Sequence, residues 1–229
     1  MTLRIILITI ALLAGSCAVD DTALGESTQA QITLNAMTFN ALTYNSITYN
    51  GIAYNGLNLG NGLDLANPDV HLFVEYLVSC ALPAGAEVAV QGETFAGALG
   101  LAPEWAIGPC EGTCQRWVSA CLLGRVNARG ERVAISMRGP KPGLHPGVRE
   151  IVDYPVEDGT FFGNLFATPQ QLFATSPRPD LALPRTCGDA GAGCPIEVVG
   201  RSADVCATWS PALGRTSCPS AEAVTVYLQ

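Results

Sequence analysis

The sequence predicts an α+β fold, in which a small disulfide-stapled domain with two core helices and short antiparallel strands follows a short repeat of five-residue units. Two segments carry apolar residues at helical spacing, and several shorter segments alternate apolar with polar residues. Nine cysteines are spread over the 229 residues, which is typical of an exported protein held by disulfides. We expect four parts, at residues 1–16, 17–31, 32–66 and 67–229.

The first part, residues 1–16, is predicted to be an export signal. One charge, Arg4, precedes an apolar run from Ile5 to Ala14, and small residues then lead to Cys17. A helix of this length covers only about 15 Å of a hydrocarbon core roughly 30 Å thick, so the run is too short to span a membrane. An ordinary secretory signal, cut nearby and leaving Cys17 as a free thiol, is the alternative.

The small residues that end on Cys17 resemble the lipobox of bacterial lipoproteins, with Ala14 where that family usually has Leu. The resemblance implies that Cys17 is acylated and anchors the mature protein in a membrane of the cell envelope. Ala18 rather than Asp follows this cysteine, which by the same resemblance favours the outer membrane. Residues 17–31 are then an acylated, disordered tether, since they are small and polar with almost nothing to bury.

Residues 32–66 contain a repeat with a period of five. Its units begin at Asn35, Asn40, Asn45, Asn50, Asn55 and Asn61. An odd period fits neither a strand nor a helix, but it fits a solenoid in which each unit makes one side of a square coil. The units resemble the pentapeptide-repeat pattern, with Phe39, Tyr44, Tyr49 and Tyr54 as central residues. So short a solenoid must pack on the following domain or on another chain, and an extended linker is the alternative.

The domain at residues 67–229 begins with a predicted helix that runs to about Ala81 and stops before Pro83. Asn67 can cap this helix, and Pro68 suits its first position. Its apolar face comprises Val70, Phe73, Val74, Leu77 and Ala81. Residues 87–91 and 93–95 then predict a hairpin.

The second helix is predicted from about Thr113 to Asn127 and is the core helix of the domain. Its buried stripe comprises Cys114, Trp117, Val118, Cys121, Leu122 and Val126. Strands are predicted at residues 132–138, 148–154, 160–166 and 224–228. A solvated turn at Glu157-Asp158-Gly159 joins the second of these strands to the third, a single helical turn follows at residues 168–171, and residues 176–186 form a Pro-rich crossover.

If Cys17 carries lipid, eight cysteines remain for disulfides, and the long gap after Cys121 divides them into two groups of four. Cys114 and Cys121 lie about 10.5 Å apart along one helix, whereas a disulfide needs Cα atoms within roughly 7 Å. Two pairings remain in this group: Cys80 with Cys121 and Cys110 with Cys114, or Cys80 with Cys114 and Cys110 with Cys121. We favour the first pairing, because it joins the apolar faces of the two helices. In the second group we favour Cys187 with Cys194 and Cys206 with Cys218.

The repeat and the segments Val78–Pro83, Trp117–Leu123 and Phe161–Phe166 are similar to cysteine-rich lipoproteins of myxobacteria that have no characterised activity. This resemblance covers most of the mature chain. It therefore supports the lipoprotein interpretation without implying an activity.

Few residues offer catalytic or metal-binding chemistry. Cys110, Cys114 and Cys121 could bind zinc together with His145, but export favours disulfides instead. Gly200-Arg-Ser202-Ala-Asp204 lacks the final glycine of a Gly-x-Ser-x-Gly nucleophile elbow and the strand-to-helix context around it, so we expect a turn. His71 is expected at the surface. We predict no metal, no cofactor and no enzymatic activity.

The net charge of −8 and the scattered arginines argue against nucleic acid as a partner. The leading hypothesis is a membrane-anchored lipoprotein with a structural or protein-contact role, whose repeat binds a protein partner or another copy. The alternatives are an exported hydrolase with an unrecognised site, or a carbohydrate or small-ligand binder that uses exposed aromatics such as those of the repeat, Trp105 or Trp209. A deep pocket with convergent Asp, His or Ser would favour the hydrolase, an aromatic-lined groove the binder, and a flat apolar patch the contact protein.

Overall fold

A computed structural model of the chain describes residues 32–35, 63–128, 130, 132–188 and 194–229. These residues adopt the α+β fold that the sequence predicts. The elements are β1 (Ile32–Asn35), α3 (Pro68–Ala81), β2 (Glu87–Val90), β3 (Glu93–Ala96), the 3-10 helix η2 (Pro103–Ala106), α4 (Thr113–Gly124), β4 (Val133–Arg138), the 3-10 helix η3 (Pro142–Leu144), α5 (Val148–Asp153), β5 (Val156–Asn164), β6 (Gln171–Ser176), α6 (Pro184–Cys187), β7 (Glu197–Arg201), α7 (Ser202–Val205), β8 (Thr208–Ser210), β9 (Gly214–Thr216) and β10 (Ala223–Leu228).

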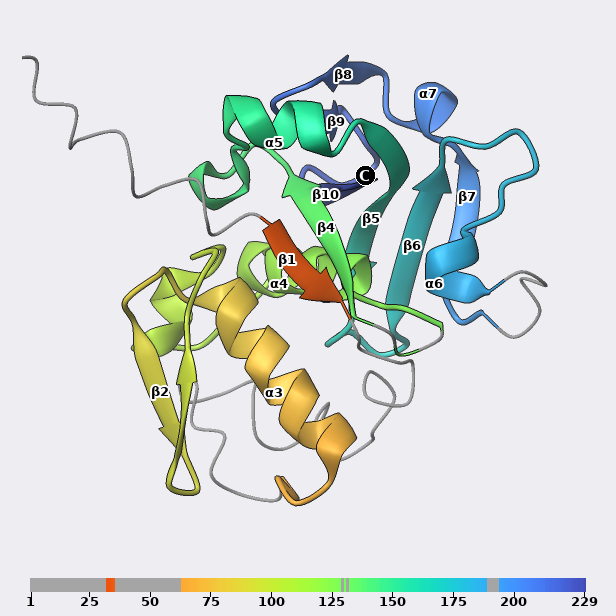
Figure 1. Cartoon of the computed structure of the whole chain (residues 1–229). Coiled ribbons are helices and arrows are strands. Elements are labelled where there is room, and N and C mark those ends of the chain that lie inside the picture. Colours follow the sequence, from red (N-terminus) through yellow and green to blue (C-terminus); the bar gives the residue numbers. More distant parts are fainter. Residues whose placement is uncertain (1–31, 36–62, 129, 131, 189–193) are drawn as a thin grey trace, which may run out of the picture.

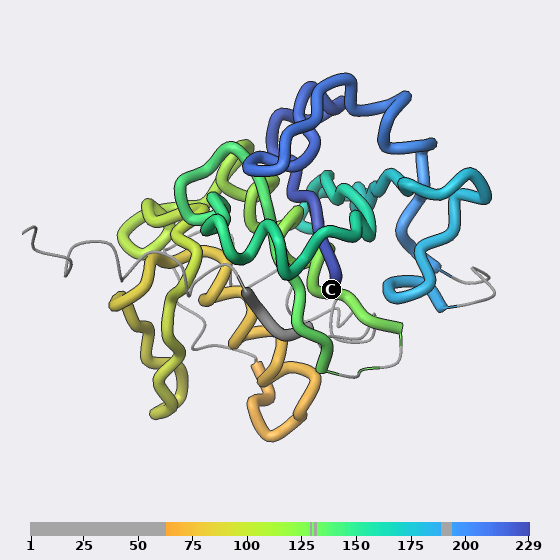
Figure 2. The backbone as a smooth tube through the Cα atoms, turned by 45° about the horizontal axis from the view of Figure 1, so that its top comes forward, coloured from red at the N-terminus to blue at the C-terminus, as the bar shows by residue number. Residues whose placement is uncertain are grey.

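A six-stranded sheet forms the centre of the fold, with the strand order β1-β4-β10-β5-β6-β7 (Figure 1). Neighbouring strands are antiparallel except β6 and β7, which are parallel. The expectation of antiparallel strands is therefore wrong for this pair, and the Pro-rich segment between them is a crossover connection. The last part of the chain, drawn in blue in Figure 2, returns from β7 to place β10 between β4 and β5.

The sheet includes residues that precede the predicted start of the domain at residue 67. β1 pairs with β4 from Ile32 opposite Ser136 to Asn35 opposite Val133. Leu63 and Leu65, in the last unit of the repeat, are buried in the core. The predicted signal, Cys17, the predicted tether and repeat residues 36–62 lie outside the described residues.

One face of the sheet packs on α4 and forms the apolar core. Alternate strand residues on this face are buried together: Ile135, Met137, Phe161, Ala174, Val224 and Val226. α4 contacts β5 and β10, and α3 contacts α4 and β3. The close approach depends on Gly124, because a Cβ atom there would lie 3.0 Å from the side chain of Val226 and 3.2 Å from that of Met137.

Both core helices begin where the sequence predicts. The Asn67 side chain accepts a hydrogen bond of 2.9 Å from the backbone N–H of Asp69, and the whole predicted apolar face of α3 is buried. α4 ends at Gly124 rather than at Asn127. The reason is tertiary, since the side chain of Arg185 from α6 donates hydrogen bonds to the carbonyl oxygens of Gly124, the last residue of the helix, and of Val126 beyond it.

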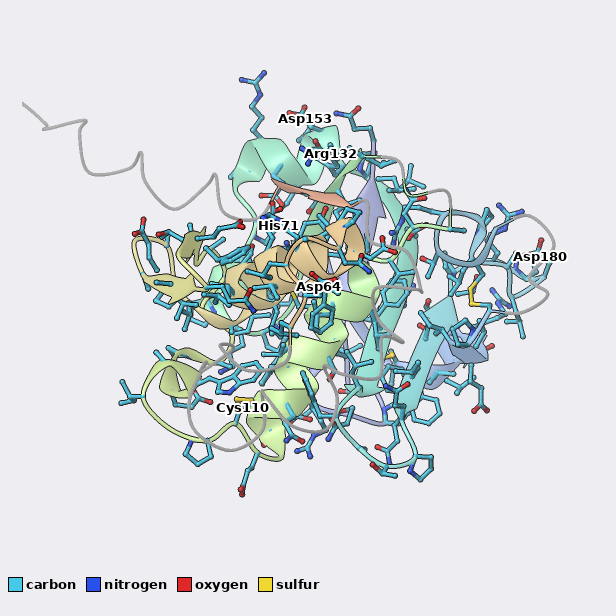
Figure 3. All side chains as sticks on the ribbon, turned by 90° about the horizontal axis from the view of Figure 1, so that it is seen from below. Asp64, His71, Cys110, Arg132, Asp153 and Asp180 are labelled. Atoms are coloured by element: carbon cyan, nitrogen blue, oxygen red, sulfur yellow. A yellow bond between two sulfur atoms is a disulfide. The ribbon has the colours of Figure 1, made fainter. Side chains whose placement is uncertain are left out.

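The opposite face of the sheet carries a layer of polar side chains without exposure to solvent. They are Ser136, Thr160, Thr175 and Thr225. The hydroxyl oxygens of Thr160 and Thr225 lie 3.1 Å apart, and the latter also accepts a hydrogen bond of 2.8 Å from the backbone N–H of Arg215. Gly214, with a φ of +66°, permits this contact, because a Cβ atom there would lie 2.6 Å from Thr225. Figure 3 shows α5, marked by Asp153, and the loop of Cys110 on opposite sides of the sheet.

Residues 148–153 form helix α5 rather than the predicted strand. Their β-branched side chains favour a strand locally. However, the guanidinium group of Arg138 in β4 donates hydrogen bonds to the carbonyl oxygens of Glu150 at 3.4 Å and Tyr154 at 2.6 Å. A cation at the carbonyl end of a helix stabilises it, so a contact from a distant strand overrides the local preference.

Glu157-Asp158-Gly159 lies inside β5 and not in a solvated turn. The carboxylate of Glu157 pairs with Arg215 of β9 at 3.0 Å, and that of Asp158 pairs with Arg185 of α6 at 2.6 Å. Both partners come from distant parts of the chain. Two acidic residues before a glycine favour a turn locally. Here the ion pairs with Arg215 and Arg185 stabilise a strand instead.

The predicted helical turn at residues 168–171 is also wrong. The peptide bond between Thr168 and Pro169 is cis, and β6 begins at Gln171. Gln171 lies opposite Asn164 in the antiparallel ladder of β5 and β6. The segment is thus the connection of a β-hairpin.

Candidate functional site

An open groove with a volume of about 460 Å³ lies where β5 ends and β6 begins. It is lined by Arg116 of α4, Phe162 and Gly163 of β5, Gln171 and Phe173 of β6, and the segment Pro219–Glu222 that precedes β10. Cavities that bind small molecules usually span roughly 300 to 1,000 Å³. The groove is therefore large enough for a small ligand.

The floor of the groove is a pair of phenyl rings. Phe162 and Phe173 lie opposite each other on neighbouring strands, with ring centroids 5.9 Å apart and an interplanar angle of 33°. They share the sheet face that carries Thr160 and Thr175, each two residues away on the same strand. Phe162 is buried, whereas Phe173 remains partly exposed. The second ring is thus the one that a ligand would meet.

One wall of the groove is an ion pair between α4 and the segment before β10. Arg116 Nε donates to Glu222 Oε2 at 2.8 Å and Nη2 donates to Oε1 at 3.2 Å, while Ser220 Oγ donates to Oε2 at 2.8 Å. The hydrogen bond from Arg116 lowers the pKa of Glu222 to about 2, although burial opposes this effect. The same bond raises the pKa of Arg116. Both groups are therefore charged at neutral pH, and their charges balance within the groove.

We expect this ion pair to lose its contribution to stability as the pH falls from about 4.5 towards about 2. The pKa of Glu222 is lower in the folded than in the unfolded protein, so the contribution is complete above the unfolded value and disappears on protonation. It should amount to about 1 to 2 kcal/mol, a discounted figure because solvent reaches Arg116. Urea unfolding at several pH values should show a smaller acid loss in Glu222→Gln than in the wild type. An identical pH dependence in the two proteins would contradict this assignment.

A second buried carboxylate belongs to Glu150 of α5. Glu150 is 3% exposed, and neither of its carboxylate oxygens forms a hydrogen bond of ordinary geometry with a described residue. Burial raises the pKa of Glu150, while Ser136, the backbone of Gly147 and the charge of Arg138 oppose the rise. The Arg138 guanidinium lies over the ring of Tyr227, 3.9 Å from its centroid. This cluster is enclosed by protein, so we assign it a role in holding α5 against the sheet.

Four disulfides join the eight cysteines that follow Cys17, and they are the pairs that the sequence analysis favours. Cys80–Cys121, Cys110–Cys114, Cys187–Cys194 and Cys206–Cys218 have Cα separations of 6.0, 5.3, 5.2 and 4.2 Å. The first joins α3 to α4, and the second closes the loop before α4, where Figure 3 labels Cys110. The cysteines considered as zinc ligands are thus all oxidised. Among the residues that the structure describes, no group of three or more His, Cys, Asp or Glu could hold a metal ion.

The residues considered for catalysis are not brought together. His71 lies at the surface, with Nε2 2.9 Å from Glu93 Oε2, and His145 is exposed on its loop. Ser202 does follow directly on a strand, β7, and begins a helix, α7, a context that was not predicted from the sequence. Yet Ser202 is fully buried, and its hydroxyl lies 3.0 Å from that of Thr175. It extends the polar layer of the sheet and does not form a nucleophile elbow.

Trp105 and Trp209, which the sequence suggested for ligand binding, do not line the groove, and the aromatic residues of the repeat lie outside the described residues. Trp105 is only 1% exposed and packs edge-on against Phe166, so its expected exposure is wrong. Trp209 is 50% exposed, and its Nε1 donates a hydrogen bond of 2.8 Å to Tyr227. Sequence reasoning missed the phenyl pair and the ion pair of the groove. Only the register of β5 with β6 and the position of β10 bring those residues together.

No helix among the described residues is long and apolar enough to cross a membrane. Comparisons with protein-family models, with curated proteins and with solved structures found no match. The geometry itself defines the class of protein: a disulfide-stapled α+β domain with an open groove that combines phenyl rings with a balanced ion pair.

Proposed function

We propose that this protein is an exported lipoprotein, anchored in the membrane of the cell envelope by an acylated Cys17, and that its domain contacts other molecules without catalysing a reaction. One observation carries the proposal. The four disulfides use every cysteine after Cys17, so no cysteine of the chain is left to form a disulfide with this residue. Disulfides of this kind persist in oxidising compartments, which supports export. Ala18 favours the outer membrane over the inner one, by resemblance to known lipoproteins.

The chemistry of the groove supports contact rather than catalysis. Its charged groups, Arg116 and Glu222, are bonded to each other, and neither histidine of the chain lines it. A general base must reach the proton that it removes, and the usual nucleophiles need such a base beside them. Ser220 in the groove donates its hydrogen bond to Glu222, whose low pKa makes it a weak base. The repeat before residue 67 would add a second contact segment for a protein partner or another copy.

The proposed anchor would hold the domain close to the membrane. Residues 18–31 separate Cys17 from the start of β1 at Ile32. A fully extended chain spans at most about 3.3 to 3.6 Å per residue, so this stretch reaches about 50 Å. Ligands of the domain would therefore be molecules at or near the membrane surface.

The lipid anchor can be tested by metabolic labelling. Radiolabelled palmitate should enter the wild-type protein expressed in bacteria and should be absent from Cys17→Ala, because that variant lacks the thiol that would accept the diacylglyceryl group carrying the first acyl chains. Ser27→Ala, a change within the tether, serves as the matched control and should keep the label. Equal labelling of the wild type and Cys17→Ala would show that the label does not depend on Cys17 and would contradict the proposed anchor.

A further inference from the structure

We propose that the groove between Phe173 and the Arg116–Glu222 ion pair binds neutral carbohydrate. This inference goes beyond the lipid anchor and does not depend on it, since every residue involved belongs to the described domain. The groove offers a ring for stacking, groups that can bind hydroxyls, and a wall that is held in place before a ligand arrives.

The phenyl floor supplies the stacking surface. Phe173 is partly exposed, and the buried Phe162 beside it supports its ring from the neighbouring strand. Cross-strand aromatic pairs are held rigidly, because neighbouring Cβ atoms on one sheet face lie only about 5 Å apart. One face of a sugar ring presents C–H groups, which pack well on the face of an aromatic ring. An apolar floor beneath a polar rim suits a ligand with one apolar face and hydroxyls at its edge.

The ion pair supplies the hydroxyl-binding groups and explains why the ligand should be neutral. A sugar hydroxyl can accept a hydrogen bond from the Arg116 guanidinium and donate one to the Glu222 carboxylate. A charged ligand would be attracted by one member of the pair and repelled by the other, because the opposite charges lie side by side. Arg116 Nε is only 2.8 Å from Glu222 Oε2. The amide of Gln171 and the hydroxyl of Ser220 add further groups of both kinds to the rim.

The walls of the groove are positioned in advance. Pro219 follows directly on Cys218, whose disulfide with Cys206 fixes the start of the segment 219–222. The end of the same segment is held by the hydrogen bonds that Glu222 accepts from Arg116 on α4. A preformed site loses less conformational entropy on binding. The volume of about 460 Å³ and the open side suit a disaccharide or a short stretch of a longer chain.

The test uses the mature protein and three neutral disaccharides: cellobiose, maltose and N,N′-diacetylchitobiose. Titration followed by NMR should show that at least one of them shifts the resonances of Phe173, Gln171 and Glu222. Phe173→Ala should weaken that binding about tenfold or more, because it removes the stacking ring. Glu222→Gln should also weaken it. Trp209→Ala removes an exposed aromatic residue outside the groove and should leave the affinity unchanged.

Several outcomes would overturn the proposal. It fails if none of the three sugars shifts the groove resonances, or if Phe173→Ala and Trp209→Ala weaken binding equally. It also fails if benzoate or toluene occupies the groove more tightly than every sugar, which would indicate a site for apolar molecules. Thermal unfolding of Phe173→Ala verifies that the variant folds. If it does not, Gln171→Ala, a change of an exposed side chain, must weaken binding severalfold for the proposal to stand.

Discussion

Replacing Arg185 with methionine is expected to lower the free energy of unfolding by about 3 to 5 kcal/mol. Arg185 Nη2 lies 2.6 Å from Asp158 Oδ2, and the two side chains are only 7% and 5% exposed. In the variant, the carboxylate of Asp158 stays buried without its partner. The cost of removing this charge from water is then no longer offset, and urea unfolding followed by circular dichroism measures the difference.

Arg185 also connects three elements of the fold. It donates a hydrogen bond of 3.1 Å to the carbonyl oxygen of Gly124 at the end of α4, and a second bond to that of Val126. Asp158 lies in β5 and Arg185 in α6, so that one side chain joins helix, strand and crossover. Methionine keeps much of the apolar volume but leaves both carbonyl oxygens without this donor. The expected loss therefore lies at the upper end of the effects of point mutations.

Arg178→Met provides the matched control. Arg178 forms an ion pair with Asp180 at 3.1 Å, but the two side chains are 55% and 56% exposed. Solvent screens such a pair, so its removal should change the stability little. A double variant, Asp158→Leu with Arg185→Met, should recover part of the loss, because no unpaired charge remains buried. Equal effects of Arg185→Met and Arg178→Met would contradict the assignment of a buried, stabilising pair.

Removal of the Cys80–Cys121 disulfide should lower the free energy of unfolding by about 4 kcal/mol. The two cysteines are separated by 41 residues and join the buried faces of α3 and α4. The bond limits the freedom of a long loop in the unfolded chain, and this effect grows with loop length. Chemical unfolding of the double variant Cys80→Ala with Cys121→Ala, compared with the wild type, measures it.

The disulfide Cys110–Cys114 is the internal control for this prediction. Its cysteines are separated by only 4 residues, so removing it should cost about 2 kcal/mol. We expect the same order in thermal unfolding, with the larger fall for the Cys80–Cys121 variant. The reverse order would mean that the short loop before α4 depends on its disulfide more than the contact between the two helices does.

Local signals were sufficient for the elements that depend on a few neighbouring residues. The start of α3 follows from Asn67 and Pro68, and its end from Pro83, because capping and the exclusion of proline act within one helical turn. The hairpin of β2 and β3 and the strand β10 follow from alternation alone. The favoured pairing of Cys80 with Cys121 follows from helix geometry, since Cys114 and Cys121 lie too far apart along α4.

Elements whose stability comes from distant residues could not be predicted in this way. Residues 148–153 form α5, and Arg138 from the distant strand β4 binds carbonyl oxygens near its end. Glu157 and Asp158 stand in a strand, where Arg215 and Arg185 from distant segments pair with their carboxylates. In each case a local preference for another structure is overridden by an interaction that forms only when the chain has folded.

The candidate site depends on tertiary structure throughout. Arg116 and Glu222 are separated by 106 residues, and Phe162 meets Phe173 through the register of two strands. Neither pair is marked by a spacing or a motif. The sequence alone was enough to predict the class of the fold, the two core helices and the favoured disulfides, because periodicity, capping and helix geometry are properties of short segments. Tertiary structure alone decided the strand order, the ion pairs and the groove, because each of these depends on which distant segments the folded chain brings into contact.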